Sequence, residues 1–174
     1  MDASSVPSPV SMNYPAPEFE RKLCPPEQLA ERLSALARPL VMTNGCFDIL
    51  HRGHVTYLAQ ARALGASLVV ALNTDASVRR QGKGEDRPIN PLAQRAAVMA
   101  ALESVSLVTW FDEDTPANLI EVVRPDVLVK GGDWPIERIV GSAETLARGG
   151  LVHSIPFEFE TSTTAMLNRI RAQG

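Results

Sequence analysis

Two histidines stand three residues apart in the stretch VMTNGCFDILHRGHVTYL (residues 41–58), and the whole chain has only three. His51 and His54 flank Gly53 at the point where an apolar strand pattern gives way to a helical one. Residues at this spacing can share one side of a helical turn. The start of a helix attracts anions, and imidazoles there can donate hydrogen bonds to phosphate oxygens. The spacing therefore predicts a phosphate-binding site.

Two other interpretations of this stretch stay open. One is a metal site, for which the available ligands are Cys46, Asp48, His51 and His54, although their spacing matches no familiar zinc pattern. The other is a purely structural histidine pair. Glycine at position 53 favours the phosphate interpretation, because it lets a ligand or backbone approach the start of the helix closely.

A second segment whose side chains could take part in chemistry is GKGEDRP, residues 82–88, which follows another predicted strand. Lys83 and Arg87 lie four apart in a loop with two glycines, which we expect to be mobile and suited to close over a polyphosphate. A charged, glycine-rich loop is also common on ordinary solvated surfaces, so this loop alone decides nothing.

The segment KGGDWP, residues 130–135, places Lys130, Asp133 and Trp134 around two glycines after a further predicted strand. An acid and an aromatic ring beside a phosphate site suggest recognition of a polyhydroxylated or planar group. An ordinary turn that needs glycine explains the same residues equally well.

A last segment, ETSTTAML, puts Ser162 and Thr163 at the start of a predicted helix. Both are typical N-cap residues. Their hydroxyls and the free N–H groups of the helix start could also hold phosphate oxygens. That second role requires the other segments to converge on the same place.

The elements that must bring these segments together alternate along the chain. Short, continuous, β-branched runs predict strands at 39–43, 67–73, 106–111, 126–132 and 151–157. Helical patterns occupy 25–37, 54–64, 91–104, 115–123 (with Thr115 as N-cap), part of 136–147, and 162–173. This alternation predicts an α/β fold, a single doubly wound sheet of about five parallel strands flanked by helices. Ligands of such sheets bind beyond the carboxyl ends of the strands, where all these segments lie.

Composition narrows the class of protein. The 174 residues are 45% apolar and 21% charged, with a net charge of −3 and no long basic run, so duplex nucleic acid is not expected as a partner. No apolar run reaches membrane-spanning length. Two cysteines, Cys24 and Cys46, make no secreted disulfide framework, and the start MDASSVPSPV lacks the pattern of a secretion signal. We expect a cytoplasmic protein.

The chain divides into a tail and one domain. Residues 1–17 are rich in serine and proline and show no periodic apolar pattern. We expect residues 1–22 to be a disordered tail whose removal leaves activity intact, and residues 23–174 to form the single domain.

The motifs together resemble those of the nucleotidyltransferase superfamily with the H-x-G-H signature. TNGCFDILHRGHV, KGEDRPINPLAQR, DVLVKGGDW and STTAMLNRI occur in order over about residues 23–172 and are similar to the subgroup that adenylylates heptose 1-phosphate. In many bacteria this activity is fused to a sugar kinase domain, so this chain resembles the stand-alone form. Glu160 departs from the pattern, because members commonly have glycine two residues before the serine.

The resemblance implies a Rossmann-like domain that transfers AMP from ATP to D-glycero-β-D-manno-heptose 1-phosphate. The products would be ADP-heptose, used for the lipopolysaccharide inner core, and pyrophosphate. Mg²⁺ would accompany ATP, the protein would be a homodimer, and no metal would be bound by protein ligands alone. The implied catalytic residues are His51, His54, Lys83 and Arg87. The implied nucleotide contacts are Asn44, Gly45, Cys46, Phe47, Gly53, Ser162 and Thr163, and the implied substrate contacts are Asp48, Lys130, Asp133 and Trp134.

Related activities remain as alternatives. Pantetheine-phosphate adenylyltransferase and glycerol-3-phosphate cytidylyltransferase are similar in fold and motif, although the basic residue of the latter's R-T-x-G-I-S-T pattern is missing here. Class I aminoacyl-tRNA synthetases share H-x-G-H, but the chain shows no K-M-S-K-S and is too short for their added domains. A module that binds ATP without turnover is the alternative outside enzymes.

Overall fold

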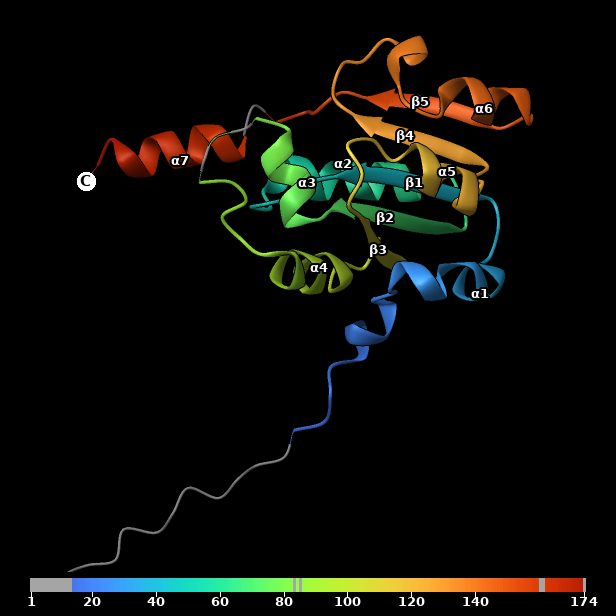
Figure 1. The fold of residues 1–174 in the computed structure, drawn as a ribbon, viewed down its shortest axis with the longest axis horizontal. Helices are drawn as coiled ribbons and strands as arrows, with labels where there is room; N and C mark the ends of the chain where they lie inside the picture. The colour runs from blue at the N-terminus through green and yellow to red at the C-terminus, as the bar shows by residue number, and fades with distance from the viewer. Residues whose placement is uncertain (1–13, 83, 85, 160–161, 174) are drawn as a thin grey trace, which may run out of the picture.

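The computed structural model describes residues 14–82, 84, 86–159 and 162–173. Its centre is one parallel sheet with the strand order β3-β2-β1-β4-β5, which confirms the predicted doubly wound α/β fold (Figure 1). The strands are β1 (Leu40–Gly45), β2 (Ser67–Asn73), β3 (Leu107–Phe111), β4 (Val127–Gly131) and β5 (Leu151–Ile155).

Helices connect the strands and cover both faces of the sheet (Figure 1). The α-helices are α1 (Leu29–Ser34), α2 (Arg52–Arg62), α3 (Asp75–Arg80), α4 (Leu92–Ala100), α5 (Ala117–Val123), α6 (Ser142–Ala147) and α7 (Thr163–Arg171). Three 3-10 turns complete the described elements: η1 (Glu18–Lys22), η2 (Pro26–Gln28) and η3 (Ile136–Arg138). None of the helices in this part of the chain is both long and apolar enough to cross a membrane.

Alternation of side chains along the strands builds two hydrophobic cores. Val41 of β1 packs with α2 and α4 on one face, whereas Leu40 and Met42 pack with α1 and α5 on the other. Strand β2 is buried along its whole length, as expected for a central strand with both faces covered. Close packing also constrains Gly65, where a Cβ atom would come within 2.4 Å of the Pro39 carbonyl oxygen.

The order of the strands creates one topological switch point. From β1 the chain winds outward through β2 and β3, and it then returns to place β4 on the other side of β1. In open α/β sheets the ligand crevice lies at such a point, beyond the carboxyl ends of the strands. The segments that follow β1 and β4 are therefore the ones positioned to form a site.

Several boundaries differ from the sequence prediction. The expected tail of residues 1–22 is too long, because Glu18–Lys22 forms η1, Phe19 packs against the core, and Lys22 donates a hydrogen bond to the Leu102 carbonyl. Residues 1–13 lie outside the described part. Helix α3 was not predicted from the sequence; it lies between β2 and the loop of residues 82–88, and Thr74 caps it by accepting a hydrogen bond from the Ser77 N–H. Thr115 does not cap α5, whose N-cap position is Pro116.

Candidate active site

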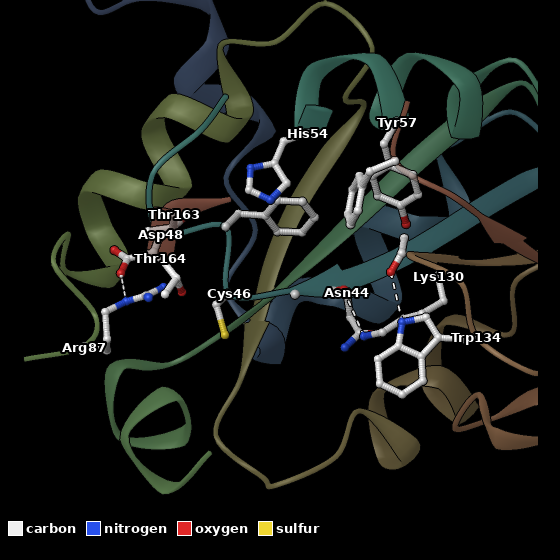
Figure 2. Close-up of a pocket in the computed structure, with 14 residues that line it drawn as sticks. Asn44, Cys46, Asp48, His54, Tyr57, Arg87, Lys130, Trp134, Thr163 and Thr164 are labelled. Carbon is white, nitrogen blue, oxygen red and sulfur yellow. Dashed lines mark hydrogen bonds and ion pairs between the residues drawn. The ribbon is translucent and has the colours of Figure 1, made fainter. Parts of the chain in front are cut away.

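A cavity of about 470 Å³ opens at the switch point, between the segments that follow β1 and β4 (Figure 2). It collects residues from all the separate motifs predicted from the sequence. The lining residues are Asn44, Gly45, Cys46, Phe47, Asp48, His54, Tyr57, Arg87, Lys130, Gly131, Trp134, Phe157, Thr163 and Thr164. This volume lies in the range of about 300–1,000 Å³ that is typical of small-ligand sites.

The loop after β1 turns sharply beneath the cavity. Phe47 adopts a left-handed backbone conformation, with φ at 45°, which is strained for a residue with a side chain. Its ring is buried and meets the His54 ring edge to face, with 5.2 Å between centroids. Gly45 is required beside it, because a Cβ atom there would come within 2.9 Å of the Phe47 ring. Packing thus holds the loop in the shape that presents His54.

The two histidines occupy different places although their rings touch. His51 is the N-cap residue of α2 and does not line the cavity, whereas His54 in the first turn does. The rings stack with 3.8 Å between centroids and 24° between planes. Among the described residues, no group donates to or accepts from the buried Nδ1 atom of His51. The side chain of His51 does not cap α2, so its first-turn N–H groups remain available to an anion.

Burial favours the neutral form of both imidazoles in the absence of a ligand. Burial lowers the pKa of His54 to about 4, and repulsion by His51 adds to the shift. Burial also lowers the pKa of His51 from its ordinary value. A bound polyphosphate would oppose this effect, since a nearby negative charge favours the protonated ring. The pair can therefore donate hydrogen bonds in the neutral form and gain charge as negative charge develops beside it.

Asp48 and Arg87 form a buried ion pair at the wall of the cavity, with 2.6 Å between Oδ2 and Nε. The Asp48 carboxylate also accepts hydrogen bonds from the backbone N–H groups of Ile89 and Asn90, at 2.9 and 2.8 Å. Burial alone would raise the pKa of Asp48, but these hydrogen bonds and the Arg87 charge outweigh it and lower the pKa. Asp48 was predicted to contact substrate, but its carboxylate is engaged with the chain. Arg87 was expected in a mobile loop, yet it is only 7% exposed.

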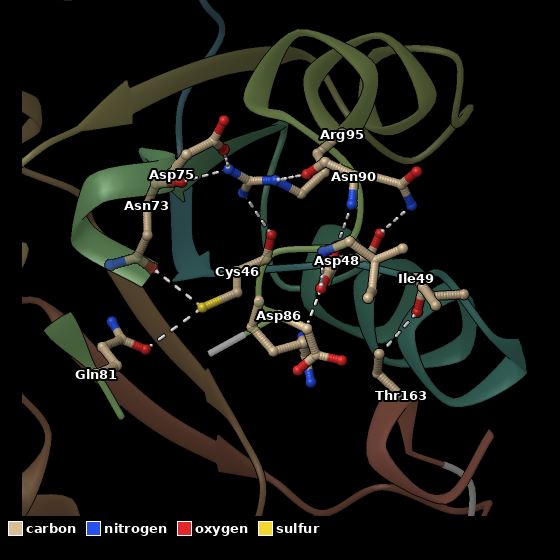
Figure 3. A network of polar contacts seen from close by, with 12 residues as sticks. Cys46, Asp48, Ile49, Asn73, Asp75, Gln81, Asp86, Asn90, Arg95 and Thr163 are labelled. Carbon is tan, nitrogen blue, oxygen red and sulfur yellow. Dashed lines mark hydrogen bonds and ion pairs between the residues drawn. The ribbon is translucent and has the colours of Figure 1, made fainter. Parts of the chain in front are cut away.

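Arg95 joins the loops behind the cavity (Figure 3), and although it ends the motif KGEDRPINPLAQR, no role was predicted for it. Its guanidinium donates to the carbonyl oxygens of Asn90, Cys46 and Asn73 at 2.8–2.9 Å and pairs with Asp75. The side chain is fully buried. One signal could have revealed it, namely an arginine on the apolar helical stripe that Leu92, Ala96 and Met99 define.

The segment after β4 contributes the wall opposite Arg87 (Figure 2). The Lys130 ammonium lies 3.5 Å from the Asn44 carbonyl oxygen, and Trp134 donates through Nε1 to the Gly131 carbonyl oxygen. Of the three residues predicted here, Lys130 and Trp134 line the cavity and the exposed Asp133 does not. Glycine is required at position 131 for steric reasons, because a Cβ atom there would come within 2.8 Å of the Phe157 ring.

The start of α7 closes the cavity from a third side. Ser162 caps the helix by accepting a hydrogen bond from the Ala165 N–H at 3.0 Å, as predicted. Thr163 donates to the Ile49 carbonyl oxygen at 3.2 Å, which ties α7 to the loop after β1. Thr163 and Thr164 both line the cavity, and Ser162 does not.

Two aromatic residues of the site were missed from the sequence. Tyr57 and Phe157 meet edge to face with 5.6 Å between centroids, and Phe157 also meets the His54 ring at 5.9 Å. They come from α2 and the segment after β5, so no local motif connects them. Together they give the cavity an apolar wall near Gly131.

Two predicted features lie outside the described residues, namely Lys83 and Glu160. Within the described ranges, no three His, Cys, Asp or Glu side chains are grouped to hold a metal ion. The Cys46 thiol, part of the alternative metal set, instead lies 3.4 Å from Oε1 of Gln81 and 3.8 Å from Oδ1 of Asn73.

Comparison with known proteins adds three findings. Residues 42–164 match the family described as cytidylyltransferase-like. The chain is 56% identical to the D-beta-D-heptose 1-phosphate adenylyltransferase of Bordetella bronchiseptica over 88% of its own length and 96% of the relative's. It is 52% identical to the bifunctional protein HldE of Marinomonas over 83% of its length, but it spans only 31% of that longer protein.

A solved structure agrees with the sequence matches. The lipopolysaccharide core biosynthesis protein of Thermoplasma volcanium superposes with a TM-score of 0.57 and 28% identity, covering 70% of this chain and 98% of that one. Together with the sequence matches, this confirms the family resemblance that the motifs indicated.

Proposed function

Because this chain belongs to the cytidylyltransferase-like family, we propose that it transfers AMP from ATP to a heptose 1-phosphate and releases pyrophosphate. The substrate we assign is D-glycero-β-D-manno-heptose 1-phosphate, and the product ADP-heptose would serve lipopolysaccharide core synthesis. The 56% identity to a relative with this name supports the substrate, since it extends over 96% of that relative. A substrate such as ATP is consistent with a cytoplasmic location.

The observation that carries the proposal is the set of donors gathered around one cavity. His54, Arg87 and the start of α7 come from three separate segments and line the same space. Their common property is attraction for anions: imidazole N–H, guanidinium, and the N–H groups and dipole of a helix start. Such a set suits a triphosphate whose charge shifts during reaction.

The reaction needs no protein nucleophile. An oxygen of the sugar phosphate attacks the α-phosphorus of ATP in line, a new P–O bond forms, and the bond to the bridging oxygen breaks with its electron pair leaving on pyrophosphate. We assign His54, supported by the stacked His51, to the α- and β-phosphates. We assign Arg87 and Lys83 to the leaving pyrophosphate or the sugar phosphate, and Ser162, Thr163 and the α7 start to the β/γ end.

Mg²⁺ fits this arrangement as a companion of ATP. Of the described residues that line the cavity, Asp48 alone carries a carboxylate, and it is occupied by Arg87 and two backbone N–H groups. The ion would therefore be held chiefly by phosphate oxygens and water, as is common for Mg²⁺, and would offset phosphate charge. A homodimer, which the family resemblance implies, is also part of the proposal.

The direct test is pyrophosphate release with Mg²⁺, comparing ATP and CTP against heptose 1-phosphate, glycerol 3-phosphate and phosphopantetheine. We expect turnover with ATP and the heptose alone, reduced on the order of 10²–10³-fold or more by His54→Ala. Turnover with another pair would contradict the sugar assignment and retain the chemistry. ATP binding without turnover for any pair would instead indicate a nucleotide-sensing module.

A further inference from the structure

A second, smaller cavity adjoins the first near the end of β1. It has a volume of about 200 Å³ and shares Asn44, Lys130 and Trp134 with the first cavity. The remaining wall comes from the end of β2, the start of α5 and the η3 turn. A nucleotide is too large for this space, whereas a single sugar ring suits it, since sites for larger ligands run from about 300 Å³ upward.

The polar groups of the second cavity include both donors and acceptors. Asn73 and Gln81 contribute amides and Arg138 contributes a guanidinium, whereas the carboxylate of Asp114 is paired with Arg80. Asn73 is fixed, because its Nδ2 donates to Ser77 at 3.0 Å. The Oε1 atom of Gln81 faces the Cys46 thiol, which turns its amide nitrogen toward other partners. A mixed set of amide and guanidinium groups matches sugar hydroxyls, which both donate and accept.

Arg138, an exposed residue of the η3 turn, is the member whose side chain is not occupied by other contacts in the described part of the chain. Several other arginines of the surface pair with acids, for example Arg80 with Asp114 and Arg148 with Glu121. In the described part of the chain the Arg138 guanidinium has no ion-pair or hydrogen-bond partner, although it lines the cavity. An arginine in this situation retains its donors for a ligand.

The shared wall gives the two cavities a chemical relation. Lys130 borders both, so its ammonium lies where a group in one cavity would meet a group in the other. A cation there favours the approach of two phosphates, which would otherwise repel each other. This is the arrangement that a transfer between two phosphorylated substrates needs.

We propose that the second cavity binds the sugar of the acceptor, with Arg138 and Gln81 contacting its hydroxyls and Lys130 lying between the acceptor phosphate and the nucleotide. This inference rests on the proposed function and deepens it. It makes Arg138 a residue that selects the acceptor and has no part in binding ATP.

The experiment is steady-state kinetics of Arg138→Ala and Gln81→Ala. Heptose 1-phosphate is varied at saturating ATP, and ATP is then varied at saturating heptose 1-phosphate. We expect KM for the sugar phosphate to rise about tenfold or more in Arg138→Ala, because a hydrogen bond to a charged group is lost. KM for ATP should stay within about twofold, and calorimetric ATP affinity should be unchanged. Arg79→Ala is the matched control, since Arg79 is exposed on the neighbouring α3 and lines neither cavity.

The outcomes separate the two proposals. An active wild type whose sugar KM is unchanged by Arg138→Ala overturns the assignment of the cavity and leaves the proposed function intact. An equal rise in the KM for ATP also overturns it, since the cavity would then serve the nucleotide. A wild type that makes no ADP-sugar refutes the proposed function together with the inference.

Discussion

The Nε atom of Arg87 lies 2.6 Å from Oδ2 of Asp48, and the side chains of Asp48 and Arg87 are 0% and 7% exposed. The contact occupies one edge of the guanidinium, and Arg87 nevertheless lines the cavity. We therefore propose that Asp48 is a positioning residue, which acts on a ligand through the orientation it gives Arg87. The carboxylate that the sequence predicted as a substrate contact is occupied by Arg87 and two backbone N–H groups.

Asp48→Asn should lower both stability and activity. Loss of one charge of a buried pair leaves the other uncompensated, and this typically costs about 3–5 kcal/mol. We expect a loss of that order in urea unfolding and a fall in kcat of at least about tenfold. Asp112→Asn is the control, because the Asp112–Arg80 pair is exposed to solvent and its loss should change the free energy of unfolding little. If Asp48→Asn and Arg87→Ala show additive losses of activity, the positioning role is wrong.

Protein stability should fall as the pH drops below neutrality, partly through His54. Its pKa is about 4 in the folded protein and near 6.5 when unfolded, so the unfolded state binds more protons between these values. The His54 contribution is complete above pH 6.5 and is lost as pH falls through about 4. From pH 8 to pH 5 it amounts to about 2 kcal/mol. Urea unfolding of the wild type and His54→Asn should differ in pH slope by this amount, and parallel slopes would contradict it.

Arg95→Lys should destabilise the protein although it keeps the charge. A lysine ammonium is a compact group and cannot span the three carbonyl oxygens that the planar guanidinium reaches. Loss of two such charged hydrogen bonds should cost about 3 kcal/mol or more. Because the loops after β1 and β2 would loosen, KM for both substrates should rise. The measurement is thermal unfolding together with kinetics, and unchanged KM values would show that Arg95 supports the fold alone.

The truncation boundary at the N-terminus should lie between residues 13 and 18. We expect removal of residues 1–13 to leave activity and melting temperature unchanged. Removal of residues 1–22 should lower stability by about 2 kcal/mol or more, because it deletes the packed Phe19 and the hydrogen bond from Lys22 to Leu102. The measurement is the melting temperature of the two truncated proteins. Equal melting temperatures would support the longer tail, residues 1–22, that was predicted from the sequence.

Local sequence patterns determined the strands, most helices and the segments that carry chemistry. Each depends on residues close in the chain: the apolar run of β2, the spacing of His51 and His54, and the capping hydroxyl of Ser162. The order of these segments also indicated the family. Such features can be read without coordinates, because backbone geometry and burial impose them over a few residues.

Only the tertiary structure determined which side chains pair with each other and which line the cavities. Asp48 and Arg87 lie 39 residues apart, and Arg95 reaches the Cys46 carbonyl across 49. No local rule assigns those partners, because they are chosen by the strand order that brings the ends of β1, β2 and β4 together. The same folding stacks His51 behind His54 and leaves the second cavity beside Lys130. A sequence names the groups that can bind an anion, but burial and long-range pairing determine which of them remain available to do so.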